Sequence, residues 1–166
     1  AQGQLCLARI EQGVRGMERL IDDLMALAKV TRAELLMVDV DLSAVSREVL
    51  KALREGDPER EVEVTLEDDL RCRGDAGLLR QLMINLIGNA WKFTSRTPAA
   101  SIHIGRQQDR LAGGPPVFFV KDNGAGFDMK FAGRLFVPFE RLHGDHDFPG
   151  TGVGLATVQR IVARHG

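Results

Sequence analysis

The N-terminal stretch repeats apolar residues at alternating steps of three and four positions. The repeat consists of Leu7, Ile10, Val14, Met17, Ile21, Leu24 and Ala28. This period is typical of a coiled-coil or bundle helix. A helix with so broad an apolar face needs cover in water, so we expect it to pair with a copy of itself or with a neighbouring helix. Packing on the core of its own chain remains the alternative.

Later segments change between strand and helix patterns. Alternating residues predict strands over 35–42 and 61–66, with a helix over 43–54 between them and a break at Gly56-Asp57-Pro58. Gly74-Asp75 predicts a turn and an N-cap for a helix from Ala76 to about Phe93. Two further strands, 101–105 and 117–120, are expected around a turn at 113–116, and a last helix over 154–164. Without strict βαβ alternation, this order predicts an α+β fold, a two-layer α/β sandwich.

Composition excludes several classes of protein. The 166 residues are 44% hydrophobic and 27% charged, which is ordinary globular usage. No apolar run approaches the roughly 20 residues of a membrane span, so we expect no membrane contact. The two cysteines, Cys6 and Cys72, lack the spacing of a zinc site or a disulfide framework, and favour a reducing compartment such as the cytoplasm. The chain begins without Met, so we expect a piece of a longer protein.

The net charge of −1 hides a gradient along the chain. Residues 39–69 hold eleven acids and four bases, whereas residues 70–166 hold thirteen bases and seven acids. The basic part is compatible with a phosphorylated ligand, and a mixed solvated surface explains it equally well. It lacks the dense basic and aromatic clusters that a nucleic-acid surface needs, so we expect no nucleic-acid partner.

The helix predicted after Asp75 carries polar residues on one face. Gln81, Asn85, Asn89 and Lys92 recur at steps of four, four and three. Amide oxygens are hard ligands suited to Mg²⁺, and a lysine can hold phosphate oxygens. A polar stripe that simply faces solvent is an equally good explanation of this helix alone.

The second motif follows an apolar strand and begins at Asp122. Glycines at 124 and 126 allow a flat ligand to approach the backbone, and the carboxylate can accept a hydrogen bond from an exocyclic amine such as that of adenine. An ordinary Asp-Asn-Gly turn is the alternative, and by itself the better one.

The third motif, Gly150–Leu155, opens the last predicted helix. Glycine-rich backbone that leads into a helix N-terminus offers free N–H groups to an anion such as a triphosphate. The polar stretch 141–149 before it fits a mobile lid over a ligand. His143, Asp145, His146 and Asp147 do not complete a rigid set of metal ligands, so we expect no transition-metal site there.

The order of these motifs resembles the catalytic ATP-binding (Bergerat) domain of sensor histidine kinases, in the superfamily shared with gyrase and MutL. The amino-acid sequences of Gly88–Thr94 and Glu140–His143 are most similar to those of phytochrome-like and PAS-linked bacterial sensor kinases. The N box resembles Asn85–Thr94, the G1 box Asp122–Phe127, the F box Phe136–Phe139 and the G2 box Gly150–Leu155. The resemblance covers nearly the whole chain.

The resemblance implies ATP and Mg²⁺ as cofactors, with Asn89 and Asn85 at the metal and Lys92 at the phosphates. Asp122 would bind the adenine amine, and Arg141 would hold phosphates under the lid. Because hydrolysing relatives have a glutamate where Asn85 stands, and an amide cannot take a proton from water, this site suits phosphate transfer to an imidazole. The implied ATP-binding set is Asn85, Asn89, Lys92, Phe93, Asp122, Gly124, Gly126, Phe139, Arg141, Thr151, Gly152, Val153, Gly154 and Leu155.

By the same resemblance, residues 1–30 are the second helix of a dimerisation hairpin and residues 31–166 an ATP-binding domain that lacks its last two strands. The four histidines, His103, His143, His146 and His165, all lie beyond the N-terminal helix, so the phosphoacceptor is absent and we expect no autophosphorylation. The implied partners are a second copy through the N-terminal helix, a response regulator receiver domain and an upstream sensor domain. An ATPase of the same superfamily and a non-catalytic dimerisation module with a degenerate nucleotide fold are the alternatives.

Overall fold

The computed structural model describes residues 34–107, 116–142, 144 and 147–166, with helical residues 13, 14, 17, 18, 20–22, 24, 25, 27, 28 and 30 before them. The elements follow in the order β1 (Met37–Asp41), α2 (Leu42–Gly56), β2 (Glu63–Leu66), β3 (Arg71–Asp75), α3 (Ala76–Phe93), β4 (Ser101–Gln107), β5 (Val117–Asp122), the 3₁₀ helix η1 (Met129–Arg134) and α4 (Gly154–His165). The fold is α+β, as predicted from the sequence.

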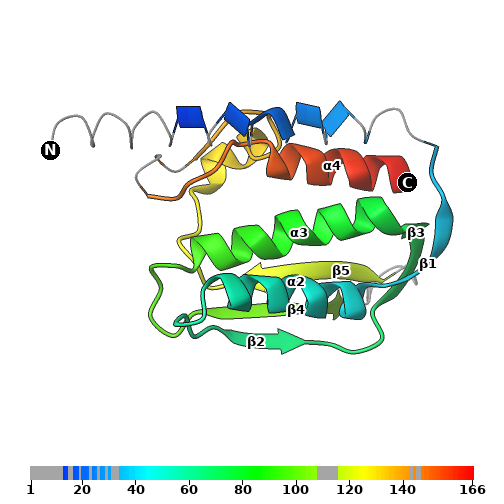
Figure 1. Cartoon of the computed structure of the whole chain (residues 1–166), viewed down its shortest axis with the longest axis horizontal. Coiled ribbons are helices and arrows are strands. Elements are labelled where there is room, and N and C mark those ends of the chain that lie inside the picture. Colours follow the sequence, from blue (N-terminus) through cyan, green and yellow to red (C-terminus); the bar gives the residue numbers. More distant parts are fainter. Residues whose placement is uncertain are drawn as a thin grey trace, which may run out of the picture.

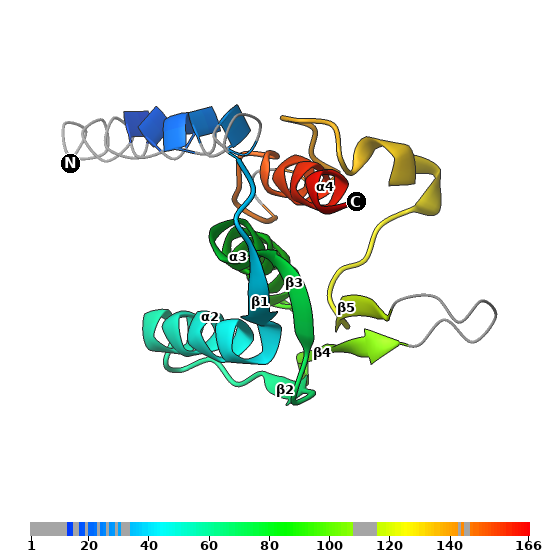
Figure 2. The same cartoon turned by 90° about the vertical axis from the view of Figure 1, so that its right-hand side faces the viewer.

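Two small sheets organise the described chain. β2, β4 and β5 form a three-stranded sheet in that order, with β2 parallel and β5 antiparallel to β4. β1 and β3 form a separate antiparallel pair. Helices α2 and α3 cover one face of the larger sheet, and α4 lies on the far side of α3 (Figures 1 and 2). The helical residues near the N-terminus lie at the same end of the molecule as α4, away from the sheet.

The core lies between α3 and β4. Leu79, Met83 and Ile87 repeat at steps of four along α3, and Ile102 and Ile104 repeat at steps of two along β4. All five side chains are buried in one apolar cluster, which Leu42, Val49, Leu50 and Leu70 extend toward α2. This core holds α3 over the sheet and leaves its polar face for α4.

Aspartates cap the N-termini of α2 and α3. Asp41 caps α2 by accepting a hydrogen bond from the N–H of Ala44 at 2.9 Å, and Asp75 caps α3 by accepting one from Leu78 at 3.0 Å. The N–H groups of Leu78 and Leu36 hold the pKa of Asp75 below its usual value. The predicted cap at Asp75 is therefore confirmed.

The turn predicted at Gly74 is wrong, because Gly74 lies in strand β3 opposite Val38. The sequence of β3 has no apolar alternation, so only pairing with β1 identifies it. A Cβ at Gly74 would stand 2.6 Å from Leu79 Cδ1 and 2.8 Å from the His165 ring. The glycine is needed for close packing between β3, α3 and the end of α4.

The apolar stripe near the N-terminus faces solvent wherever it is described. Val14, Met17, Ile21 and Leu24 are 41–60% exposed, so the alternative that this stripe packs on the chain's own core is wrong for them. Leu7 and Ile10 lie outside the described residues. Val30 by contrast is buried, and its carbonyl accepts a hydrogen bond from Arg164 of α4. Among the described residues no helix has the length and apolar character needed to cross a membrane.

Candidate functional site

The polar face of α3 meets the first turn of α4. Asn85 donates a hydrogen bond from Nδ2 to the carbonyl of Gln81 at 3.0 Å, which turns its Oδ1 toward Gly154. A Cβ on Gly154 would lie only 2.9 Å from that oxygen. Within the described part of the chain, the half-buried Asn89 amide makes no hydrogen bond. The two amides thus present oxygen ligands beside a helix N-terminus.

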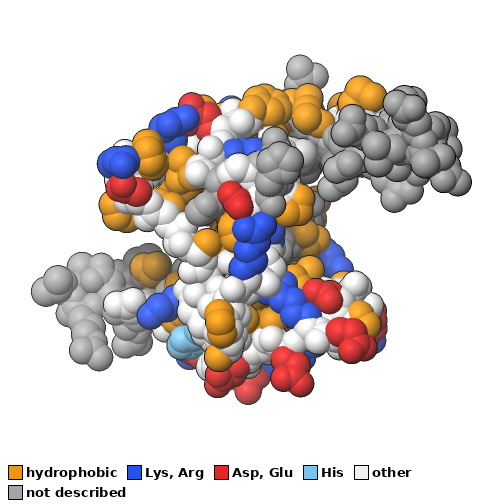
Figure 3. All heavy atoms as spheres, turned by 90° about the vertical axis from the view of Figure 1, so that its left-hand side faces the viewer, with side chains coloured by type: hydrophobic (Ala, Val, Ile, Leu, Met, Phe, Trp, Pro, Cys, Tyr) orange, Lys and Arg blue, Asp and Glu red, His pale blue; other side chains and the backbone are white. Residues whose placement is uncertain are grey.

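Two cations gather at the end of α3. Lys92 Nζ lies 4.4 Å from the centroid of the Phe93 ring and 3.2 Å from the position of a Cβ at Gly150. Burial, together with the nearby charge of Arg141, lowers the pKa of Lys92 from its ordinary value. Figure 3 shows this end of the molecule, with Lys and Arg side chains across its middle. Two like charges beside glycine backbone form a site that favours an anion.

The backbone before α4 is shaped by its glycines. Gly152 has a φ of +78°, and a Cβ there would lie 2.9 Å from the carbonyl oxygen of Glu140. The carbonyl of Gly152 accepts a hydrogen bond from the N–H of Phe139 at 3.1 Å. No side chain caps α4 at Val153. The first N–H groups of this helix are therefore available to an anion without displacement of a capping side chain.

The carboxylate of Asp122 lies at the end of β5, as the sequence predicts. Its Oδ1 accepts a hydrogen bond from the N–H of Gly124 at 2.9 Å. The N–H of Ala125 donates to the carbonyl of Phe93 at 3.1 Å, which joins this turn to the last residue of α3. A Cβ on Gly124 would lie 2.6 Å from the same carbonyl oxygen, so only glycine permits this approach.

Asn123 fixes the same turn from the other side. Its side chain accepts a hydrogen bond from the N–H of Ser101 at 2.8 Å and donates one to the carbonyl of Ala99 at 3.0 Å. These bonds tie the turn to the start of β4. The sequence motif contains Asn123, but its structural role emerges only from the contact with residues far earlier in the chain.

The structure thus brings most of the predicted residues together in pairs. Asn85 lies beside Gly154, Lys92 beside Gly150 and Phe93 beside Gly124, and the charge of Arg141 acts on Lys92. The side chain of Val153 is fully buried, so only its backbone can face a ligand. Phe139 has a φ of +66° and is 51% exposed. Gly126 also has a positive φ, while Thr151 and Leu155 lie in the same segment as Gly152 and Gly154.

Phe148, which was not among the predicted site residues, lies in the stretch interpreted as a polar lid. Its side chain is buried, its ring packs edge-to-face on Phe93 with centroids 5.1 Å apart, and its carbonyl accepts a hydrogen bond from Arg141. A single large aromatic residue in a polar stretch was the available signal. His143, Asp145 and His146 lie outside the described residues, and no group of three metal-ligating side chains occurs among those that are described.

Comparisons with known proteins find related sequences over most of the chain. Residues 74–166 match the family described as "Histidine kinase-, DNA gyrase B-, and HSP90-like ATPase". The chain is 36% identical over 93% of its length to cyanobacterial phytochrome A of Nostoc, and 32% identical over 96% to the methanogenesis regulatory histidine kinase FilI of Methanothrix harundinacea. It spans 20% and 18% of those two relatives, or about a fifth of their length.

Solved structures give the same result. Full-length ShkA in complex with AMPPNP matches 98% of this chain with 34% of its own, at 27% identity and a TM-score of 0.71. The mycobacterial sensor histidine kinase MprB matches 79% of this chain with 81% of its own, at 27% identity and a TM-score of 0.63. The similarity therefore extends over the described helices and strands as well as the motifs.

Proposed function

The chain belongs to the family of histidine kinase-, DNA gyrase B- and HSP90-like ATPases, and from this premise we propose how it uses ATP. The nucleotide lies between the polar face of α3, the turn after β5 and the N-terminus of α4. The observation that carries this proposal is the approach of Lys92 to Gly150, with Arg141 beside it. Two partly buried cations at an uncapped helix N-terminus favour a triphosphate.

The adenine end of the ligand lies at Asp122. One carboxylate oxygen is occupied by the N–H of Gly124, and within the described chain the other accepts no hydrogen bond. That oxygen can accept a bond from the exocyclic amine of adenine. Gly124 and Gly126 leave room for the flat base beside the backbone.

Mg²⁺ fits the two amides of α3. Asn89 has no hydrogen-bond partner among the described residues, and the Oδ1 of Asn85 faces the start of α4. Both offer the neutral oxygen ligands that Mg²⁺ accepts alongside water and phosphate oxygens. When bound, the ion would neutralise part of the charge of the triphosphate. Asn89 is the proposed main ligand, and Asn85 assists it.

The reaction that this site favours is transfer of the γ-phosphate to a histidine of a sensor histidine kinase. Asn85 cannot take a proton from water, so hydrolysis lacks a general base at that position. Lys92 and Arg141 supply positive charge for the transferred group, and Phe148 holds Arg141 through its carbonyl. Catalysis then rests on positioning and on charge neutralisation.

The partners follow from the same proposal. The N-terminal helix joins two copies through the exposed stripe that contains Met17 and Ile21. A receiver domain of a response regulator takes the phosphate from the histidine, and a sensor domain of the full-length protein controls the transfer. The use of ATP supports a cytoplasmic location. Because the first histidine of the sequence is His103, on β4, the chain by itself does not phosphorylate itself.

Titration with a non-hydrolysable ATP analogue, with and without Mg²⁺, tests the site in the wild type and in Asn89→Ala. We expect Mg²⁺ to raise the affinity of the wild type about tenfold, which is a free-energy difference of about 1.4 kcal/mol, and to change that of Asn89→Ala much less. Asn89→Asp, which keeps an oxygen ligand, should retain the response. Equal affinity in every case contradicts the assignment of Asn89 as a magnesium ligand. Separately, acid-labile phosphate on the chain after incubation with labelled ATP would contradict the lack of autophosphorylation.

A further inference from the structure

We propose that Phe148 is a positioning residue, which is fastened to the end of α3 and holds Arg141 where the triphosphate binds. The ion pair between Arg96 and Asp147 braces Phe148 in this place. The role rests on the proposed function and deepens it, because none of Arg96, Asp147 and Phe148 belongs to the predicted ATP-binding set.

The rings of Phe93 and Phe148 join the last residue of α3 to the segment before α4. Their centroids lie 5.1 Å apart in an edge-to-face arrangement, and Phe148 is buried. Each of the two residues contacts one of the cations proposed for the phosphates. Lys92 Nζ lies 4.4 Å from the centroid of the Phe93 ring, and Arg141 donates a hydrogen bond to the carbonyl of Phe148. The aromatic pair therefore links the supports of both positive charges.

The backbone around Phe148 is restricted, which fixes the direction of its carbonyl. Pro149 follows, and a residue before proline favours extended conformations. The N–H groups of Asp147 and Phe148 both donate to the carbonyl of Gly144, at 3.0 and 3.3 Å. A fixed acceptor holds the long side chain of Arg141 in fewer conformations, so less entropy is lost when that side chain binds a phosphate.

Arg96 and Asp147 form a second attachment beside the rings. Arg96 Nη1 lies 2.8 Å from Asp147 Oδ1, and the guanidinium carbon of Arg96 lies 5.3 Å from the centroid of the Phe148 ring. Both charged side chains are more than half exposed, so the ion pair contributes little to stability by itself. Their opposite charges cancel, so the pair does not change the net charge near the phosphates. Its effect on ATP binding is therefore exerted through the position of Phe148.

Calorimetric titration of the full chain with a non-hydrolysable ATP analogue plus Mg²⁺, and with adenosine, tests this role. We expect Phe148→Ala to weaken binding of the analogue about tenfold and that of adenosine less than about twofold. The reason is that adenosine has no phosphate for Arg141 to hold. Equal losses for the two ligands overturn the proposal and make Phe148 a wall of the base site instead.

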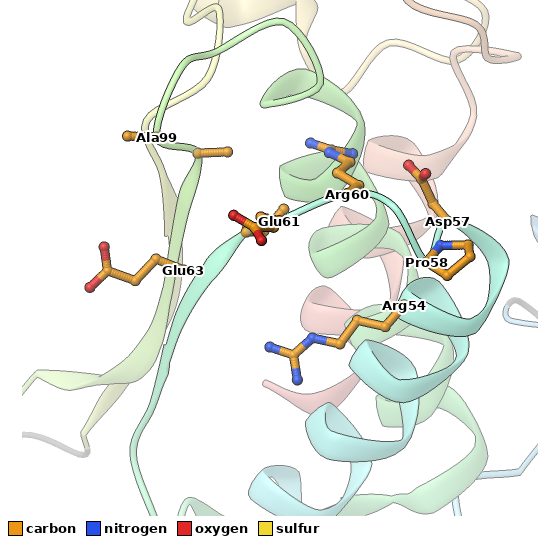
Figure 4. Close-up of a pocket in the computed structure, with 9 residues that line it drawn as sticks. Arg54, Asp57, Pro58, Arg60, Glu61, Glu63 and Ala99 are labelled. Atoms are coloured by element: carbon orange, nitrogen blue, oxygen red, sulfur yellow. The ribbon is translucent and has the colours of Figure 1, made fainter.

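Arg96→Gln keeps the buried ring and breaks only the brace, so it tests the role even where Phe148→Ala unfolds the chain. We expect it to weaken binding of the analogue about threefold and to leave adenosine binding unchanged. Arg54→Gln is the matched control, with an equal loss of charge. Arg54 extends from α2 into a hollow of about 480 Å³ beside β2, which no residue of the predicted ATP-binding set lines (Figure 4). Equal effects of the two variants overturn the brace.

A double-mutant cycle separates the positioning of Arg141 from other effects of the ring. In a chain that carries Arg141→Met, Phe148→Ala should cause little further loss of affinity for the analogue, because the side chain that it positions is already absent. Additive losses overturn the positioning role alone. A wild type that binds the analogue no more tightly than adenosine contradicts the proposed phosphate site, and the positioning role with it, so the two failures are distinguishable.

Discussion

The side-chain oxygen of Asn85, in the middle of α3, lies 2.9 Å from the point where a Cβ of Gly154 would stand. The two residues are far apart in the sequence. Because they lie side by side in the fold, the start of α4 lies next to the proposed magnesium and phosphate site. Figure 1 shows the two helices side by side, with the first turn of α4 over the second half of α3. A glycine at this position lets the helix N-terminus and an amide ligand share one space.

Gly154→Ala should therefore weaken nucleotide binding with little loss of fold stability. The new Cβ displaces the flexible end of Asn85, so we expect the affinity for an ATP analogue with Mg²⁺ to fall by about tenfold. Calorimetric titration measures this change. Gly88→Ala is the matched control on α3, because a Cβ there meets nothing within 4 Å. It should preserve binding and stabilise the helix by about 0.5–1 kcal/mol. Equal affinity in the two variants contradicts the role given to Gly154.

Lys92→Met should stabilise the chain without nucleotide while it weakens triphosphate binding. Burial and Arg141 disfavour the charged form of Lys92, so its pKa in the folded state lies below 10.5. The unfolded chain therefore binds more protons in the window below pH 10.5, and the stability contributed by this residue rises with pH there.

The advantage of Lys92→Met in the free energy of unfolding is thus largest at neutral pH and shrinks as the pH rises toward 10.5. Urea denaturation at several pH values measures it against the wild type. An advantage that grows with pH would have the wrong sign and would contradict a charge-destabilised Lys92.

Gly124→Ala should damage both the fold and the adenine site. The added Cβ would lie 2.6 Å from the carbonyl oxygen of Phe93 and 2.8 Å from the carboxylate of Asp122. Backbone at the end of α3 must move, so we expect a loss of about 1–3 kcal/mol in the free energy of unfolding. Binding of adenosine should also weaken. Gly133→Ala, in η1, places its Cβ in open space and should change neither quantity.

Ile21→Glu should convert a dimer into monomers. Ile21 is 59% exposed in the described chain, so its replacement does not disturb the core, whereas a charge within a helix-to-helix seam opposes association. Sedimentation over a range of concentrations measures the change. Met129→Glu is the control, because Met129 is 74% exposed on η1 and outside the stripe. A monomeric wild type, or loss of the dimer in both variants, would contradict assembly through this helix.

Local chemistry made several elements predictable. Asp75 caps α3 because its side chain satisfies the N–H of Leu78, a contact within one turn of the same helix. The length of α3 follows from its apolar positions, and the position of Asp122 follows from the strand before it. The sequence did not predict strand β3, because its charged residues have no strand preference of their own. Pairing with β1 holds them in the extended conformation.

The sequence by itself determined the residues of the proposed nucleotide site and the order in which they occur, because glycine backbone, amide side chains and helix caps act over a few neighbouring residues. Only the tertiary structure decided that Asn85 contacts Gly154 and that the carbonyl of Phe148 accepts a hydrogen bond from Arg141. A periodic pattern of polar and apolar residues indicates which face of a helix or strand is polar. Which distant segment covers that face depends on how the core between α3 and β4 packs.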